Sequence, residues 1–297
     1  MAQIDLKGIF PPVTTPFVND QVAYDKLAFN VEKYGRTGLK GIVVLGSNGE
    51  YVSLSEEEKR KVVETVVQAT PDHMLVIAGT GCESTRETIR LTADCAAAGA
   101  HVALVVTPHY FGGKMSDAAL INHFTMVADR SPIPIMLYNV PQFTHVNLTV
   151  NVVAELSRHP NIIGIKDSTG NVMQLGEFLG QVDSDFSVLV GTASALYGAL
   201  TLGCVGGVLA LANVTPETCV KIQALIQEGD FKAAQQIQLK MIPVNKAVTA
   251  VFGIAGLKTA LDMLGYFGGE PRAPLLPSSE ETKQAIENIL KQADLLD

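Results

Sequence analysis

The stretch Ile162-Ile163-Gly164-Ile165-Lys166-Asp167-Ser168 is the part of the chain from which the fold can best be worked out. It is short, apolar and β-branched, and it follows a loop at His159-Pro160-Asn161, a pattern typical of a buried strand. One lysine stands in it, and lysine is almost never fully buried unless it is paired or used in chemistry. Burial disfavours a charged amine, and a neutral amine can attack a carbonyl carbon to form a Schiff base. The alternative is a lysine on an edge strand whose head group reaches water.

Seven further apolar runs lie along the chain, with helix-like segments between them. Together with the lysine strand they form a series of eight, and the other seven are Gly8–Phe10, Gly41–Leu45, Met74–Ala78, His101–Val106, Ile133–Tyr138, Phe186–Val190 and Gly207–Leu211. The runs are continuous rather than alternating, as expected for strands buried on both faces of a parallel sheet. Ser55-x-x-Glu58 and Ser84-x-x-Glu87 are capping boxes, which predict the starts of two intervening helices.

Eight strand–helix units within about 210 residues predict a (β/α)8 barrel, an α/β fold of the TIM-barrel type. We expect residues 1–214 to form the catalytic barrel and residues 215–297 to form a helical region packed on it. Within this region, the glycine- and proline-rich stretch from Gly253 to Pro277 predicts a break between two helical segments. A doubly wound open sheet is the main alternative fold. Its dinucleotide-binding form needs G-x-G-x-x-G, and Gly79-Thr80-Gly81-Cys82-Glu83-Ser84 has serine in the last place.

Composition limits the classes of partner. The chain has 297 residues and a formal net charge of −8 without a basic block, which argues against a nucleic-acid or anionic-membrane partner. No apolar run approaches a membrane span, and Met1–Leu6 lacks the basic and apolar regions of a signal peptide. The four cysteines form no C-x-x-C pair and no zinc-site spacing. We therefore expect reduced thiols in a cytoplasmic protein, or in a mature chain whose targeting segment has been removed.

In a barrel of this type the active site lies at the carboxyl ends of the strands. The lysine strand ends in Lys166, the strand before it ends in Tyr138, and Tyr110 follows the fourth strand. The second strand is followed by Gly46–Glu50, a small polar loop that can hold a carboxylate, although an ordinary turn has the same composition. A phenol near an amine can move the protons that carbinolamine formation and dehydration require. This set favours Schiff-base chemistry on a 2-oxo acid over a metal site or a phosphate-binding loop.

Three ordered motifs resemble those of the dihydrodipicolinate synthase / N-acetylneuraminate lyase family of class I aldolases. They are Gly46-Ser47-Asn48-Gly49-Glu50, Tyr138-Asn139-Val140-Pro141 and Gly164-Ile165-Lys166-Asp167-Ser168, and the likeness extends over essentially the whole chain. The resemblance implies a (β/α)8 barrel with C-terminal helices, usually assembled as a homotetramer that is a dimer of dimers. It also implies a pyruvate Schiff base on Lys166, an aldehyde as the second reactant, and no metal or organic cofactor.

The resemblance also implies roles for individual residues. Tyr138 would move protons over the imine, assisted by Ser47, and Tyr110 would reach into the site of a neighbouring subunit. The expected substrate contacts are Ser47, Asn48, Gly49, Ser168, Gly191 and Leu209.

Departures from the family pattern indicate which of the family's reactions to expect. Dihydrodipicolinate synthases usually carry two threonines where Ser47 and Asn48 stand, a tyrosine at His109, and an arginine at Phe143 to hold the carboxylate of the aldehyde substrate. The loop Gly46–Glu50 is more similar to that of 4-hydroxy-2-oxoglutarate aldolases, which release pyruvate and glyoxylate, although those of the animal type carry serine at Asn139. The alternatives are 4-hydroxy-tetrahydrodipicolinate synthase, a lyase or dehydratase for sugar-derived 2-oxo acids, and a non-catalytic pyruvate-binding regulator.

Overall fold

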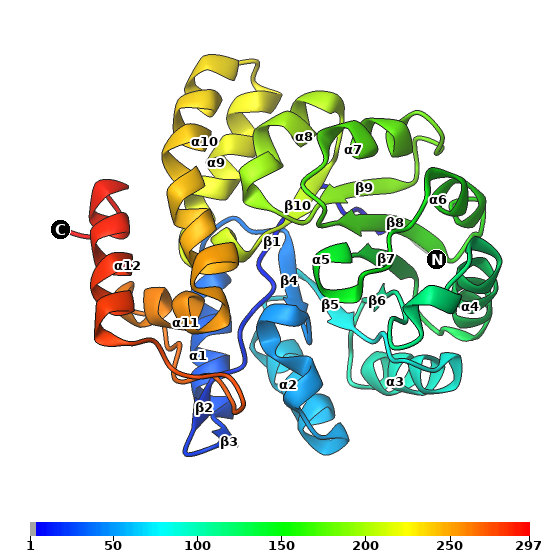
Figure 1. Ribbon diagram of the computed structural model, residues 1–297, viewed down its shortest axis with the longest axis horizontal. Helices are drawn as coiled ribbons and strands as arrows, with labels where there is room; N and C mark the ends of the chain where they lie inside the picture. Colours follow the sequence, from blue (N-terminus) through cyan, green and yellow to red (C-terminus); the bar gives the residue numbers. More distant parts are fainter. Residues whose placement is uncertain (1–3) are drawn as a thin grey trace.

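The computed structural model describes residues 4–297, and its central feature is a ring of eight parallel strands surrounded by helices (Figure 1). The strands follow one another around the ring in the order β1 (Gly8–Phe10), β10 (Gly206–Val208), β9 (Ser187–Val190), β8 (Ile162–Asp167), β7 (Ile135–Asn139), β6 (Val102–Val106), β5 (Leu75–Gly79) and β4 (Gly41–Val44). The predicted TIM-barrel fold is confirmed. Met1–Gln3, part of the stretch for which no signal peptide was predicted, lie outside the described residues.

The ring closes between β1 and β4 through a short seam. Pro12 and Val43 form a parallel bridge, and Val43 N donates to Pro11 O at 3.0 Å while Val13 N donates to Val43 O at 2.9 Å. Because Pro11 and Pro12 have no N–H group, the ladder at this seam stays short.

Helices cover the outside of the ring. They are α1 (Tyr24–Tyr34), α2 (Glu56–Ala69), α3 (Thr85–Ala97), α4 (Asp117–Arg130), α6 (Val150–Leu156), α7 (Val172–Leu179), α8 (Leu196–Leu202) and α9 (Pro216–Gln227), with the short α5 (Pro141–Thr144) after β7. The predicted capping box at Ser55 and Glu58 is complete. At Ser84 only half of the box forms, because the Glu87 carboxylate accepts a hydrogen bond from Arg90 Nε at 2.8 Å. A small hairpin of β2 (Phe17–Val18) and β3 (Gln21–Val22) precedes α1.

Strand residues alternate between two buried layers. The inward-facing layer includes Phe10, Val43, Leu104, Met136 and Tyr138, while the intervening residues pack between the strands and the helices. Both faces of the sheet are therefore buried, which explains the continuous apolar runs. The prediction that the eighth strand reaches Leu211 is wrong: it ends at Val208, and residues Ala210–Asn213 form a 3-10 turn that Asn213 Nδ2 stabilises by donating to Ala210 O at 3.1 Å.

The C-terminal region is helical and lies on one side of the barrel (Figure 1). It contains α10 (Phe231–Lys246), the π-helical turn η6 (Ala247–Val251), α11 (Gly253–Met263) and α12 (Glu280–Gln292). The predicted break over Gly253–Pro277 is wrong in its first half, which is α11. Gly256 is used there for close packing, since a Cβ atom on it would lie 2.4 Å from Phe252 Cβ.

Helix α9 follows β10 and packs against α8 and β1. The division of the chain at residue 215 stays a proposal. Across residues 4–297, no helix is both long enough and apolar enough to cross a bilayer.

Candidate active site

Adjacent strands bring the predicted lysine and tyrosine together inside the barrel. Tyr138 on β7 is the register partner of Lys166 on β8, so both side chains leave the sheet on the same face. Lys166 Nζ lies 3.9 Å from the centroid of the Tyr138 ring, and Lys166 is only 4% exposed. Because β8 is paired on both sides, by β7 and by β9, the alternative of an edge-strand lysine with a solvated head group is wrong.

The loop after β4 adds a hydroxyl group to this pair. Ser47 begins the 3-10 turn η1 (Ser47–Gly49), and its Oγ lies 3.4 Å from the Tyr138 hydroxyl. A small cavity beside them is lined by Leu45, Gly46, Ser47, Tyr51, Gly79, Gly81, Leu104, Val106 and Tyr138. The Ser47 hydroxyl can thus exchange a proton with the Tyr138 phenol, and Lys166 Nζ lies over the face of the same ring.

The same turn presents an unused donor. The Asn48 Nδ2 atom is buried and has no hydrogen-bond partner among residues 4–297. A buried donor without a partner is costly unless a ligand or water satisfies it. Next to it, the Gly49 carbonyl accepts a hydrogen bond from Thr15 Oγ1 at 2.7 Å, and a Cβ atom on Gly49 would come within 3.1 Å of Val13 O. Gly49 thus serves the turn through its backbone carbonyl and through the close packing that its missing side chain allows.

Ser168 and Gly191 also lie together, at the ends of β8 and β9. A Cβ atom on Gly191 would lie 1.9 Å from Ser168 Oγ and 2.8 Å from Ser168 Cα, so only glycine leaves room for the hydroxyl. Leu209, the sixth expected substrate contact, is fully buried, and its N–H donates to Phe10 O at 2.9 Å. Its role and those of Ser168 and Gly191 stay predictions.

A buried carboxylate joins the two strands that carry the lysine and the tyrosine. Asp167 is fully buried and accepts hydrogen bonds from Asn139 Nδ2 at 2.7 Å and from Gln174 Nε2 at 3.0 Å. Asn139 Oδ1 in turn accepts from Leu148 N at 3.0 Å. These bonds fix the end of β7 against the end of β8, one residue beyond Tyr138 and Lys166.

Tyr51 is a site residue that the sequence analysis did not identify. Its ring lines the cavity, and burial, with a smaller contribution from Tyr138, raises its pKa to about 12, so its hydroxyl stays protonated at neutral pH. The feature of the sequence that could have identified Tyr51 is its position directly after the motif that ends at Glu50.

Tyr110 is not among the residues that line this cavity. It is 78% exposed and packs edge-to-face on Phe111, with ring centroids 5.0 Å apart. The Glu83 carboxylate holds its backbone by accepting from Tyr110 N at 2.8 Å. Phe143, at the position where an arginine was expected in a dihydrodipicolinate synthase, is 63% exposed.

Residues 4–297 contain no group of three or more His, Cys, Asp or Glu side chains arranged to hold a metal ion. That the reaction needs neither metal nor organic cofactor stays a prediction.

Comparison with known proteins gives the family. The sequence profile described as the dihydrodipicolinate synthetase family matches residues 5–293. The chain belongs to this family. A 4-hydroxy-tetrahydrodipicolinate synthase from Methanothrix thermoacetophila is 39% identical over 292 residues, which are 97% of this chain and 98% of the relative.

Solved structures agree with this assignment. The dihydrodipicolinate synthase of Acinetobacter baumannii, solved with pyruvate, superposes with a TM-score of 0.93 at 30% identity and covers 98% of this chain and 100% of its own. YagE, a prophage protein of the same family from E. coli K12, also solved with pyruvate, gives 0.91 at 31% identity, with 98% and 99% covered. The resemblance to this family is confirmed, whereas the closer likeness to 4-hydroxy-2-oxoglutarate aldolases stays a prediction. The chain is a carbon–carbon lyase of the class I, pyruvate-dependent aldolase type.

Proposed function

We propose that Lys166 forms a Schiff base with the 2-oxo group of its substrate and that the enzyme cleaves 4-hydroxy-2-oxoglutarate to pyruvate and glyoxylate. The observation that carries the proposal is the buried Lys166 amine beside Tyr138, with Ser47 within reach of the phenol.

The chemistry follows from these groups. Lys166 Nζ attacks C2 of the substrate, and the resulting carbinolamine loses water to give a protonated imine. Tyr138 gives its phenolic proton to the hydroxyl that leaves the carbinolamine as water. The resulting phenolate, relayed by Ser47, takes the proton of the C4 hydroxyl as the C3–C4 bond breaks. The electron pair of that bond moves into the imine and forms an enamine, and glyoxylate leaves. Protonation at C3 and hydrolysis then release pyruvate and free Lys166. The unused Asn48 amide donor is suited to the C1 carboxylate.

The choice of aldehyde rests on Phe143. Two carbons separate the carboxylate of aspartate semialdehyde from its aldehyde carbon, and a phenyl side chain at residue 143 offers that carboxylate no ion pair. In glyoxylate the carboxylate is attached directly to the aldehyde carbon, so it stays near the reacting centre and needs no cation at residue 143.

A second candidate is 4-hydroxy-tetrahydrodipicolinate synthase, which condenses pyruvate with aspartate semialdehyde. The names of the curated relatives favour it, including the one that is 39% identical. The two candidates share Lys166, Tyr138 and Ser47 and differ only in the second reactant.

The test is borohydride reduction in the presence of pyruvate, followed by mass mapping of peptides. We expect a stable pyruvyl adduct on Lys166 and none in Lys166→Ala. Glyoxylate and aspartate semialdehyde are then compared as second reactants by kcat/KM. An adduct on another lysine would disprove the mechanism, and a higher kcat/KM with aspartate semialdehyde would select the second candidate. Pyruvate trapping without turnover of any aldehyde would instead indicate a pyruvate-binding regulator.

We further propose that the enzyme acts in the cytoplasm as a homotetramer. The exposed pair Tyr110 and Phe111 supports association, because large exposed aromatic side chains mark interaction surfaces. The four cysteines of the described chain are unpaired, which supports a reducing compartment.

A further inference from the structure

The turn that carries Ser47 and Asn48 lies between two strained residues. Leu45 has φ of 56° and Glu50 has φ of 52°, both in the left-handed region that non-glycine residues rarely adopt. Two backbone hydrogen bonds close the turn: Gly49 N donates to Gly46 O at 3.0 Å, and Glu50 N donates to Ser47 O at 3.1 Å. Such a conformation persists only where the surroundings enforce it.

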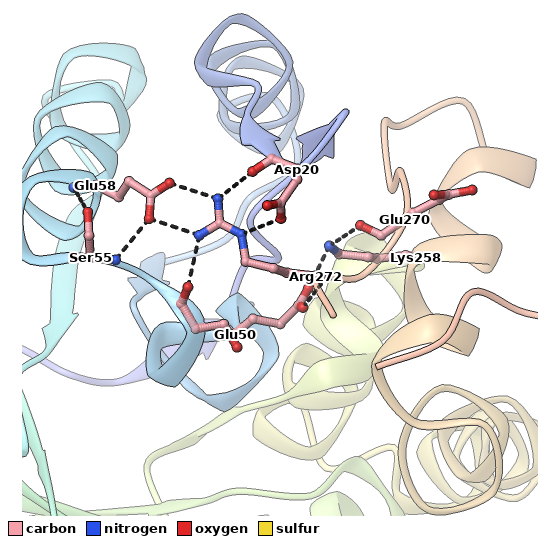
Figure 2. Close-up of polar contacts among 8 residues, drawn as sticks. Asp20, Glu50, Ser55, Glu58, Lys258, Glu270 and Arg272 are labelled. Atoms are coloured by element: carbon pink, nitrogen blue, oxygen red, sulfur yellow. Dashed lines mark hydrogen bonds and ion pairs between the residues drawn. The ribbon is translucent and has the colours of Figure 1, made fainter. Parts of the chain in front are cut away.

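The Glu50 side chain connects this turn to the C-terminal region (Figure 2). Glu50 is 3% exposed, and its Oε1 lies 2.6 Å from Lys258 Nζ on α11. Its Oε2 accepts a hydrogen bond from Arg272 N at 2.8 Å. Both carboxylate oxygens are therefore held by a segment more than two hundred residues away in the sequence.

Lys258 is itself fixed in place. It is 1% exposed, its Nζ donates to Glu270 O at 2.9 Å, and the same atom lies 4.4 Å from the centroid of the Phe17 ring. Burial lowers the pKa of Lys258, while Glu50 opposes this shift by stabilising the charged amine. Gly268 packs so closely that a Cβ atom on it would lie 1.9 Å from Lys258 O. The ammonium group has little freedom to move.

Arg272 extends the connection to the other end of the same loop (Figure 2). Its guanidinium donates to both carboxylate oxygens of Glu58 on α2, at 2.8 and 2.7 Å, and to Ser53 O at 2.8 Å. It also donates to Asp20 O, in the β2–β3 hairpin, at 2.7 Å. The stretch from Glu50 to Glu58 is thus held at both ends by Arg272, through its backbone N–H at Glu50 and its guanidinium at Glu58.

We propose that the buried Glu50–Lys258 ion pair positions the Ser47–Gly49 turn for catalysis, which makes Glu50 and Lys258 positioning residues of the aldolase reaction. A buried ion pair adds little net stability, because desolvation offsets the attraction between the charges. The ion pair does fix the position of the Glu50 side chain relative to α11. Because the Glu50 N–H donates to Ser47 O, this also fixes the turn. The inference rests on the proposed function, in which Ser47 assists Tyr138.

The experiment measures the rate of borohydride trapping at graded pyruvate concentrations, which yields an apparent affinity for pyruvate and a maximal trapping rate. The variants are Glu50→Gln, Lys258→Met and the double variant with both changes. Lys240→Met is the matched control, because it removes an exposed lysine of the same helical region that pairs with Asp294. We expect Glu50→Gln and Lys258→Met to lower trapping efficiency about ten- to a hundredfold, the scale of a 1 Å misplacement at a reacting centre. Lys240→Met should behave as wild type.

A double-mutant cycle separates positioning from a general loss of structure. If Lys258 acts through Ser47, its substitution should cost less than about threefold in a Ser47→Ala background. The same loss in both backgrounds would overturn the inference. The double variant removes both charges, so it guards against a single variant that fails to fold. Its melting temperature should be closer to that of wild type than those of the single variants, while its trapping stays weak.

Wild-type trapping in a folded double variant would also overturn the inference and leave the proposed function intact. Absence of an adduct on the wild-type protein would instead overturn the proposed function, and the inference with it.

Discussion

At the scale of single residues, the proposed chemistry depends on the Tyr138 hydroxyl. Tyr138→Phe removes it and leaves the ring that packs against Lys166. We expect turnover to fall by about a hundredfold or more, the usual contribution of a positioned acid–base group, while the circular dichroism spectrum is unchanged. Steady-state kinetics with the preferred aldehyde measure this effect, and a normal rate would remove Tyr138 from the mechanism.

Gly191 shows how one missing side chain shapes the site. Gly191→Ala would place a methyl group 1.9 Å from Ser168 Oγ and 2.8 Å from Ser168 Cα, and the backbone contact cannot be relieved by rotating a side chain. We expect a loss of about 1–3 kcal/mol in the free energy of unfolding, together with weaker pyruvate trapping. Gly113→Ala is the control, because nothing lies within 4 Å of the added atom there. Equal behaviour of the two variants in urea unfolding and trapping would contradict this account.

At the scale of elements, Asp167 holds β7 and β8 together at the site. Asp167→Ala would leave Asn139 Nδ2 and Gln174 Nε2 each with one acceptor fewer, since each also donates to Asn147 Oδ1. Removing a buried hydrogen-bond acceptor leaves its donors without that partner, which is costly in free energy. We therefore expect the free energy of unfolding, measured in urea, to fall by about 2–4 kcal/mol. Asp185→Ala, an exposed aspartate, should change it by less than about 0.5 kcal/mol. A loss for Asp167→Ala no larger than that of the control would show that the two strand ends are held by other contacts.

Helices α3 and α4 meet at a buried histidine that makes stability depend on pH. Burial lowers the pKa of His123 to about 4, and its Nδ1 lies 2.9 Å from Thr85 Oγ1. Since the pKa is depressed in the folded state, the unfolded chain binds the proton first as pH falls. The stabilisation is therefore complete above about pH 6.5 and is lost towards pH 4.

We expect His123 to account for about 2 kcal/mol of the stability lost between pH 7 and pH 5. Urea unfolding at both pH values should show a pH dependence that is smaller by this amount in His123→Gln. An unchanged dependence would assign the acid sensitivity to other groups.

At the scale of the whole molecule, the role that the family resemblance implies for the exposed Tyr110 predicts an active site shared between subunits. If Tyr110 serves a neighbouring subunit, co-expression of Tyr110→Phe with Lys166→Ala creates hybrids in which one site has both groups. Random pairing would then restore about a quarter of the wild-type activity. Co-expression of Lys166→Ala with Tyr138→Phe is the control. Lys166 and Tyr138 of one site come from the same chain, so no hybrid of these two variants contains a site with both residues intact. Lack of rescue in the first mixture would place the function of Tyr110 elsewhere.

The barrel and the core of the candidate site can be predicted from local sequence patterns. Continuous apolar runs separated by capped helices predict strands buried on both faces, and parallel strands end at a common rim, so Ser47, Tyr138 and Lys166 were expected to lie near one another. The error at Gly253–Pro277 has a local cause, because glycine was interpreted as a helix breaker where Gly256 serves close packing in α11.

The remaining features of the site depend on contacts between segments that are distant in the sequence. No local sequence pattern predicts the register that pairs Tyr138 with Lys166 or the placement of Tyr51 in the cavity. The same is true of the contacts of Glu50 with Lys258 and Arg272, because each of these features joins segments that are distant in the sequence. Periodicity and capping report which face of an element is buried, whereas the partner that covers that face is fixed by the packing of the complete chain.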